Sequence, residues 1–173
     1  MIINNMDYLL SIIPELKYTI GFDQKNPHHH LDVWGHTIYA LSLSKKDFDI
    51  RLCLLLHDIG KPFSFQDEKI RHFYNHPLVS SNMSRIILSR LNYDQEYIDY
   101  ICNLIRYHDT FIKDEQINNN YDFYKKLYEI QKCDAYAHNP DKLEKRIKYL
   151  ETTKKKLLIR GDNNGNGRCI WWE

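Results

Sequence analysis

The sequence has no apolar run of membrane-spanning length and no closely spaced cysteines. No apolar stretch approaches the roughly 20 residues that a transmembrane helix needs, so no membrane partner is expected. The four cysteines, at positions 53, 102, 133 and 169, form no CxxC pair. Their spacing argues against a zinc knuckle or a disulfide framework and predicts reduced thiols in a cytoplasmic protein. No basic segment followed by an apolar one resembles a secretory signal.

An excess of charge of one sign is also missing. The 24 Lys and Arg residues nearly balance the 23 Asp and Glu residues, giving a net charge of +1. Such a balance argues against a surface that coats nucleic acid non-specifically, although a local basic patch remains open. No DNA partner is expected. No internal repeat and no alternating strand pattern is visible, so a repeat protein and a sheet are both disfavoured.

Apolar residues at helical spacing predict an all-α fold. The length of 173 residues suits one domain, and the 43% apolar and 27% charged fractions are ordinary for a globular protein. We expect one helical domain over residues 1–160, with about six to seven helices, and an Asn/Gly-rich tail over 161–173. The expected helices cover residues 6–16, 31–43, 47–59, 76–90, 95–107, 122–137 and 141–157.

The helix expected over residues 47–59 should run through the core, because residues 52–56 are almost wholly apolar. Gly60 is expected to end it in a left-handed cap, and Pro62 prevents its continuation. Further along the chain, residues 117–121 are expected to form a polar loop.

His57 and Asp58, at the end of this apolar run, are the most informative feature of the chain. A buried imidazole and carboxylate are costly unless something satisfies them, and a divalent metal would do so. Neighbouring helical residues point about 100° apart, so both side chains can reach an ion at the end of the helix. His36 and Asp134 could complete the protein ligands of this first ion.

A second ion is also possible, because Asp58 has two oxygens and can bridge to an ion held by His76 and His108. Two ions roughly 3.5–4 Å apart can generate and hold a hydroxide for in-line attack on phosphorus. The mixed imidazole and carboxylate ligands favour Mn, Fe, Co, Ni or Zn over Mg or Ca. We therefore expect one or two divalent transition-metal ions. The alternative is that His76 and His108 are hydrogen-bonded groups lining a one-metal pocket.

Several residues near these ligands could contact a substrate. Lys61 follows Asp58 by one turn and could neutralise a phosphoryl oxygen, the alternative being a solvated lysine. Substrate contact is also expected for His72, Arg106 and His29. Four aromatic side chains of the following loop could stack a base, the alternative being that they pack the loop onto the core: Phe63, Phe65, Phe73 and Tyr74.

Several ordered phrases resemble the HD-domain superfamily of metal-dependent phosphohydrolases. They resemble most the HD domain of bacterial tRNA nucleotidyltransferases, the CCA-adding enzymes. The phrases are QKNPHHHLDVWGHT, LLHDIGKP, DEKIRHFYNH, SRIILSRL, IRYHD and CDAYAH. The resemblance implies that metal is bound by His36, His57, Asp58 and Asp134, and the extended two-metal pattern adds His76 and His108.

The resemblance implies a phosphomonoesterase or phosphodiesterase acting on nucleotides or RNA ends, such as 2′,3′-cyclic phosphate or 2′-phosphate. Asp58 and Lys61 would be its catalytic residues. No Gly-Ser phrase followed by paired carboxylates is present, so CCA addition is not expected, and we expect a free-standing HD domain or a piece of a split or truncated gene. Two alternatives stay open: a non-catalytic module that binds tRNA or a partner polypeptide, and a di-iron HD-type oxygenase.

Overall fold

The computed structural model describes residues 5–66 and 68–163, and these residues form an all-helical fold. The expected all-α class is confirmed, because the described residues contain no strand beyond a single bridge between Gln66 and His72. Within this part of the chain no helix is long and apolar enough to cross a membrane. The eight α-helices are α1 (Met6–Ile12), α2 (Val33–Leu43), α3 (Phe48–Leu56), α4 (His76–Arg90), α5 (Gln95–Tyr107), α6 (Asp114–Asn119), α7 (Tyr121–Tyr136) and α8 (Glu144–Asn163). Three 3-10 segments complete the fold: η2 (Pro14–Thr19), η3 (Lys61–Phe63) and η4 (Pro140–Lys142).

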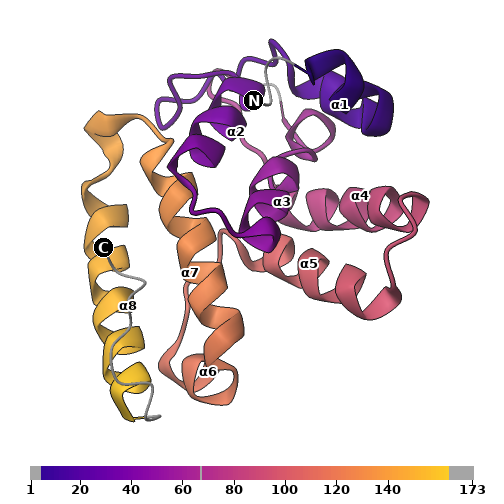
Figure 1. Cartoon of the computed structure of the whole chain (residues 1–173). Helices are drawn as coiled ribbons and strands as arrows, with labels where there is room; N and C mark the ends of the chain where they lie inside the picture. The colour runs from indigo at the N-terminus through magenta and orange to yellow at the C-terminus, as the bar shows by residue number, and fades with distance from the viewer. Residues whose placement is uncertain (1–4, 67, 164–173) are drawn as a thin grey trace.

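Two helical pairs flank a central helix. Helices α4 and α5 lie side by side, and α7 and α8 form a second pair, with α8 at the outer edge of the molecule (Figure 1). Helix α3 lies between the pairs and packs against α2, α4, α5 and α7. The end of α3 therefore lies where several helices can bring side chains together.

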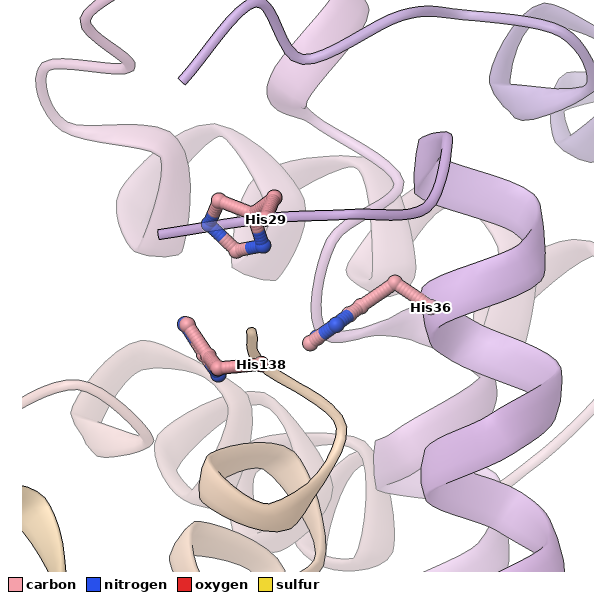
Figure 2. A group of neighbouring side chains, drawn as sticks. All are labelled: His29, His36 and His138. Atoms are coloured by element: carbon pink, nitrogen blue, oxygen red, sulfur yellow. The ribbon is translucent and has the colours of Figure 1, made fainter. Parts of the chain in front are cut away.

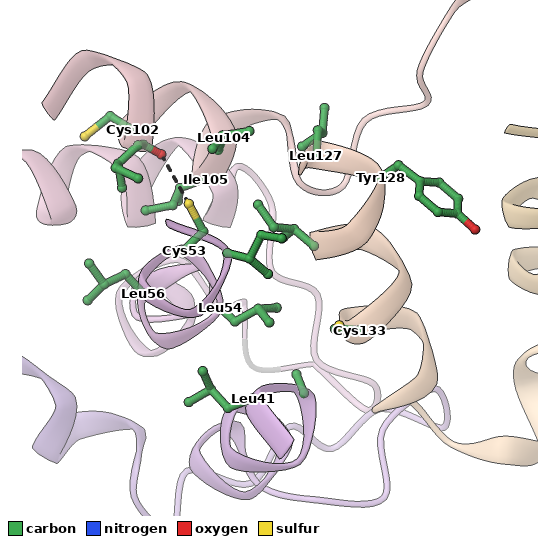
Figure 3. Packing of buried hydrophobic residues seen from close by; sticks show 14 of the residues in the cluster. Leu41, Cys53, Leu54, Leu56, Cys102, Leu104, Ile105, Leu127, Tyr128 and Cys133 are labelled. Atoms are coloured by element: carbon green, nitrogen blue, oxygen red, sulfur yellow. Dashed lines mark hydrogen bonds between the residues drawn. The ribbon is translucent and has the colours of Figure 1, made fainter. Parts of the chain in front are cut away.

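The core surrounds α3, as its apolar sequence predicts. Leu54 and Leu56 are completely buried, and Figure 3 shows α3 packed between side chains of α2, α5 and α7. Cys53 of the same helix is a free thiol, and burial raises its pKa well above the usual range. Cys102 and Cys133 are free and buried as well. These three cysteines pack as small apolar side chains, without the thiolate character that reactivity requires.

Several expected helix boundaries differ from the structure. Helix α2 begins at Val33, two residues later than expected, and α3 ends at Leu56, three residues earlier than expected. Helix α1 ends at Ile12, earlier than expected, because Pro14 cannot continue an α-helix and instead begins η2. Helix α8 begins at Glu144, after η4, and continues to Asn163, past the expected end. The first three residues of the expected tail are therefore helical, and residues 164–173 lie outside the described part of the chain.

The prediction of a loop at residues 117–121 is wrong. Helix α6 spans Asp114–Asn119 there, which makes eight α-helices among the described residues where six or seven were expected. The backbone N–H of Lys113 donates to Oε1 of Gln116 at 2.8 Å, which satisfies one free donor at the start of the helix. Ile117 is 2% exposed and anchors the helix to the core. Because the segment contains only one buried apolar residue, no helical spacing of apolar residues could be recognised in its sequence.

The left-handed cap predicted at Gly60 is also wrong. Gly60 has φ −83° and ψ −12°, which any residue can adopt. The reason for glycine is space, because a Cβ at this position would lie 2.5 Å from the backbone nitrogen of Ser80 in α4. The backbone N–H of Gly60 also donates to Oγ of Ser80 at 2.9 Å. Gly60 thus allows α4, which begins with His76, to approach the end of α3.

Candidate metal centre

Three helices deliver the first four expected ligands to one buried point. His36 lies on α2, His57 and Asp58 follow the last residue of α3, and Asp134 lies in the last turn of α7. Their exposed fractions are 0%, 0%, 1% and 4%. Buried polar side chains are tolerated only where partners are arranged for them, so this group requires a specific partner.

The nitrogen and oxygen atoms of this first group lie close together. Nε2 of His36 is 2.8 Å from Oδ1 of Asp134 and 3.6 Å from Oδ2 of Asp58. Nε2 of His57 is 3.3 Å from Oδ2 of Asp58 and 3.5 Å from Oδ1 of Asp134. One atom from each residue lies within 4.8 Å of the others, which is compact enough to surround a metal ion.

A second group shares Asp58 and includes both other expected ligands. Nε2 of His76, from the first residue of α4, is 3.4 Å from Oδ1 of Asp58. Nε2 of His108, at the end of α5, is 4.0 Å from the same oxygen and 3.3 Å from Nε2 of His76. The two oxygens of Asp58 therefore face different groups. This is the arrangement that a carboxylate bridging two ions requires.

The tautomers of the four histidines suit metal binding. The carbonyl three residues earlier in the chain lies 2.8, 3.0 and 2.7 Å from Nδ1 of His57, His76 and His108, respectively. Nδ1 of His36 is 3.1 Å from the carbonyl of Ala137. Because a carbonyl can only accept, each Nδ1 carries the proton, and each neutral ring keeps an Nε2 lone pair for an ion.

Orphaned buried atoms show that these residues fit a metal. Nε2 of His57 and both carboxylate oxygens of Asp58 are buried without a hydrogen-bond partner. Nζ of Lys61 is 2.7 Å from Oδ2 of Asp58, but this ion pair lacks hydrogen-bond geometry. A divalent cation would satisfy all three atoms, and the mixed nitrogen and oxygen donors suit Mn, Fe, Co, Ni or Zn.

The charges of the first group are strongly coupled. Burial would raise the pKa of Asp58, but His57 and Lys61 outweigh it and hold the pKa well below its usual range. Burial would likewise raise the pKa of Asp134, but His138, His36 and His57 lower it. Burial would lower the pKa of His57, yet Asp58 and Asp134 raise it to about 10. Without metal, a proton on His57 therefore partly balances the two carboxylates.

A family model for the HD domain matches residues 28–151, the stretch that carries all six candidate ligands. The chain belongs to the HD-domain family. The resemblance drawn from the sequence phrases is thus confirmed, and the donor groups described above lie within the matched residues.

Two of three curated relatives of this chain are tRNA nucleotidyltransferases by name, and the third is a CCA protein. The chain is 30% identical to a CC-adding tRNA nucleotidyltransferase of Thermus thermophilus over 60% of its own length and 26% of the relative. It is 34% identical to an A-adding tRNA nucleotidyltransferase of Deinococcus radiodurans, over 56% and 24% of the two chains. It is 28% identical to a multifunctional CCA protein of Hahella chejuensis, over 79% and 32%. The chain thus spans about a quarter to a third of the length of these relatives.

A cavity of about 320 Å³ opens beside the two groups of candidate ligands. Asp58, Lys61 and two of the expected substrate contacts, His29 and His72, line it. Lys61 is only 4% exposed, so it is not a solvated lysine, and its Nζ donates to Oε1 of Gln24 at 2.8 Å. Arg106 is exposed on α5 and does not line this cavity.

Two residues beside Asp134 were missed from the sequence. Nδ1 of His138 donates to the backbone carbonyl of Asp134 at 2.8 Å, and Nη1 of Arg146 is 3.2 Å from its Oδ2. Nη2 of Arg146 also donates to Oδ1 of Asp109 at 3.1 Å. His138 could have been found, because it follows Asp134 by four residues. Arg146 comes from another helix, and its position relative to Asp134 gives no sequence signal.

His29, His36 and His138 form a third group of nitrogen donors (Figure 2). The rings of His29 and His138 lie 4.4 Å apart between centroids, and the loop carrying His29 is tied to the end of α7 by Asn139. Burial lowers the pKa of His138 to about 4, so its ring is neutral at pH 7. Nδ1 of His36 donates to the carbonyl of Ala137, and its Nε2 lies 2.8 Å from Oδ1 of Asp134 and so faces the first group. The third group is therefore not an independent ion site.

Proposed function

We propose that this HD domain is a metal-dependent phosphohydrolase, a phosphomonoesterase or phosphodiesterase that acts on nucleotides or RNA ends. Substrates of the 2′,3′-cyclic phosphate or 2′-phosphate type are included. The observation that carries the proposal is the juxtaposition of two ligand groups, joined by Asp58, with a cavity into which Lys61 also faces. Membership of the HD-domain family and the tRNA enzymes among the relatives support a phosphate-bearing nucleotide or RNA substrate.

The proposed cofactor is one or two divalent transition-metal ions. His36, His57, Asp58 and Asp134 would hold the first, and Asp58, His76 and His108 the second. When bound, such an ion supplies Lewis acidity toward a phosphoryl oxygen and makes a water molecule a better nucleophile.

Free buried thiols at Cys53, Cys102 and Cys133 support the expected cytoplasmic location.

The chain's own residues would bind and orient the phosphoryl group. Lys61 would neutralise a phosphoryl oxygen, since its ammonium is fixed by Asp58 and Gln24 beside the cavity. Such fixed charges stabilise developing negative charge without having to reorganise during the reaction. Arg146 also lines the cavity and adds a second cation. Asp58 would join the metal to the lysine, which makes it the central catalytic residue.

Phosphate release tests this function. The protein, loaded with Mn, Co or Ni, is offered a panel of nucleotides that includes 2′,3′-cyclic and 2′-phosphate forms, with an EDTA control. We expect chelator-sensitive release from a subset of the panel. Lys61→Ala should lower kcat about a hundredfold, equal to about 2.7 kcal/mol. The matched control is Lys69→Ala, in the loop after η3, which should have no effect because Lys69 is exposed and does not line the cavity.

A binding module is the second candidate, because the relatives are named for nucleotide transfer to tRNA and not for hydrolysis. No release from a folded, metal-loaded protein would refute the hydrolase and favour this module. Release with Zn, which has no redox chemistry, would exclude the di-iron oxygenase as the explanation of that activity.

A further inference from the structure

The aromatic residues around the loop before α4 have two different fates. Phe65 and Phe73 pack edge-on against Phe22, with centroid distances of 5.2 and 6.4 Å. The guanidinium of Arg71 lies 4.9 Å from the Phe22 ring and 4.8 Å from the Phe65 ring. Phe65 and Phe73 therefore pack the loop onto the rest of the fold, which was the alternative to base stacking.

Tyr74 remains largely exposed. Its exposed fraction is 58%, and its ring stacks on His72 at 5.5 Å between centroids and 18° between planes. His72 and Tyr74 both line the cavity of the metal centre. An exposed ring of this size forgoes the free energy of burial unless a ligand covers it.

The backbone that carries this pair is fixed in advance. The N–H of Gln66 donates to the carbonyl of His72 at 2.9 Å. The N–H of Arg71 donates to the carbonyl of Lys25 at 3.1 Å, and Nδ2 of Asn26 donates to the carbonyl of Arg71 at 3.0 Å. The first bond closes the loop on itself, and the other two tie it to residues 25–26. Because the backbone at this rim of the cavity is already ordered, a flat ligand can bind to it with little loss of conformational entropy.

The distance between this aromatic pair and the ligand groups suits the length of one nucleotide. Tyr74 precedes the candidate ligand His76 by two residues, so their Cα atoms lie at most about 7.6 Å apart. A phosphoryl group at the metal centre thus places its attached nucleoside near this rim. Stacking on aromatic side chains suits any base, because every base has a π face.

We propose that His72 and Tyr74 form a stacking platform for the base of the substrate, so that the site selects phosphates attached to a nucleoside. This inference rests on the proposed function, since it places the phosphoryl group at the metal groups. The base can come from a mononucleotide or from the end of a single-stranded RNA, because both present the same π face.

Calorimetric binding to the metal-loaded protein tests the platform without requiring turnover. The probes are adenosine 5′-monophosphorothioate, which is hydrolysed slowly, and inorganic phosphate. Tyr74→Ala should weaken binding of the nucleotide analogue about tenfold, equal to about 1.4 kcal/mol, and change that of phosphate less than about twofold. Tyr74→Phe should bind like the original protein. The matched control is Phe63→Ala, because Phe63 is 52% exposed and does not line the cavity.

Unchanged affinity of Tyr74→Ala for the analogue, an equal loss for phosphate, or no binding of the analogue by the original protein would each overturn the platform. A 5′-thiophosphorylated trinucleotide distinguishes the two sources of the base: tighter binding than the mononucleotide favours an RNA end, and equal binding favours a mononucleotide. Analogue binding that depends on Tyr74 in a protein that releases no phosphate would refute the hydrolase and keep the platform. Phosphate release that is unchanged in Tyr74→Ala would refute the platform and keep the hydrolase.

Discussion

The two ligand groups that share Asp58 are built differently. The first has four members, from α2, from α7 and from the two residues after α3, and their side chains are at most 5% exposed. The second has two histidines at helix ends beside the cavity, and the side chain of His76 is 12% exposed. The first group is therefore the more deeply buried of the two, although Asp58 and Asp134 reach the cavity, and the second group lies at the cavity with both of its histidines.

The groups also differ in charge. Without metal, the pKa of His57 is raised to about 10 by Asp58 and Asp134 against the effect of burial, so the first group holds a proton at pH 7. Burial lowers the pKa of His76 to about 4 and also lowers that of His108, so the second group is neutral apart from the shared carboxylate. An ion entering the first group must displace a proton, whereas an ion entering the second need not.

Asp58→Asn should have the largest effect, because Asp58 belongs to both groups. We expect the bound transition metal, measured by elemental analysis, to fall to near zero. Phosphate release should fall about a thousandfold, equal to about 4 kcal/mol. Asp109→Asn is the matched control, because Asp109 lines the same cavity but belongs to neither group. Metal content unchanged in Asp58→Asn would show that the two groups do not bind metal through this residue.

His36→Ala and His76→Ala should separate the groups. We expect two ions per chain in the original protein and one in His76→Ala, whose first group is intact. His36→Ala should lose the ion of the first group, and each variant should lower phosphate release about a hundredfold, equal to about 2.7 kcal/mol. One ion in the original protein, unchanged in His76→Ala, would support the alternative that His76 and His108 only line a one-metal pocket.

The sequence predicted both groups because their members lie close to a buried apolar run or inside phrases that resemble a known family. His57 and Asp58 end the most apolar helix, and the phrases around His36 and Asp134 matched a known pattern. The cavity was less predictable, because it depends on which side chains helix packing brings together. Arg146 reaches Asp134 from α8, whereas Arg106, expected at the site, is exposed on α5 and does not line the cavity. A residue near a ligand in sequence can face either side of its helix, and only packing decides which.

Gly60 shows the same limit in the backbone. Gly60 and Pro62 predict a helix stop, and α3 does end before them, at Leu56. The sequence could not show that the space was needed for a helix whose first residue lies 16 positions later. Glycine patterns indicate local turns more readily than close approaches between distant segments.

Metal binding to the first group should release a proton. Because the pKa of His57 is raised to about 10, its charged form stabilises the metal-free fold fully below pH 6.5 and loses that effect as pH rises through 10. Metal competes with this proton, so the affinity for Mn should rise about tenfold per pH unit between pH 6 and 8. Calorimetry in buffers of different ionisation enthalpy measures the number of protons released, which should be close to one. His76→Ala should leave that number unchanged, and an absence of release would contradict the difference in charge between the groups.

Gly60→Ala should have the smallest effect and should act mainly on the second group. The new Cβ would lie 2.5 Å from the backbone nitrogen of Ser80, so α4 must move away from η3. Such overpacking costs about 2 kcal/mol and should lower Tm by about 4–8 °C. Because His76 begins α4, its Nε2 should move away from Asp58, while the contacts among His36, His57 and Asp134 persist. We therefore expect weaker binding of the second ion with the first retained.

Gly21→Ala is the matched comparison. This substitution strains the backbone, because Gly21 has a φ of +70°, but its new Cβ would have no atom within 4 Å and so would not push on another helix. Equal loss of both ions in Gly60→Ala would show that the two groups are not independently supported by the fold.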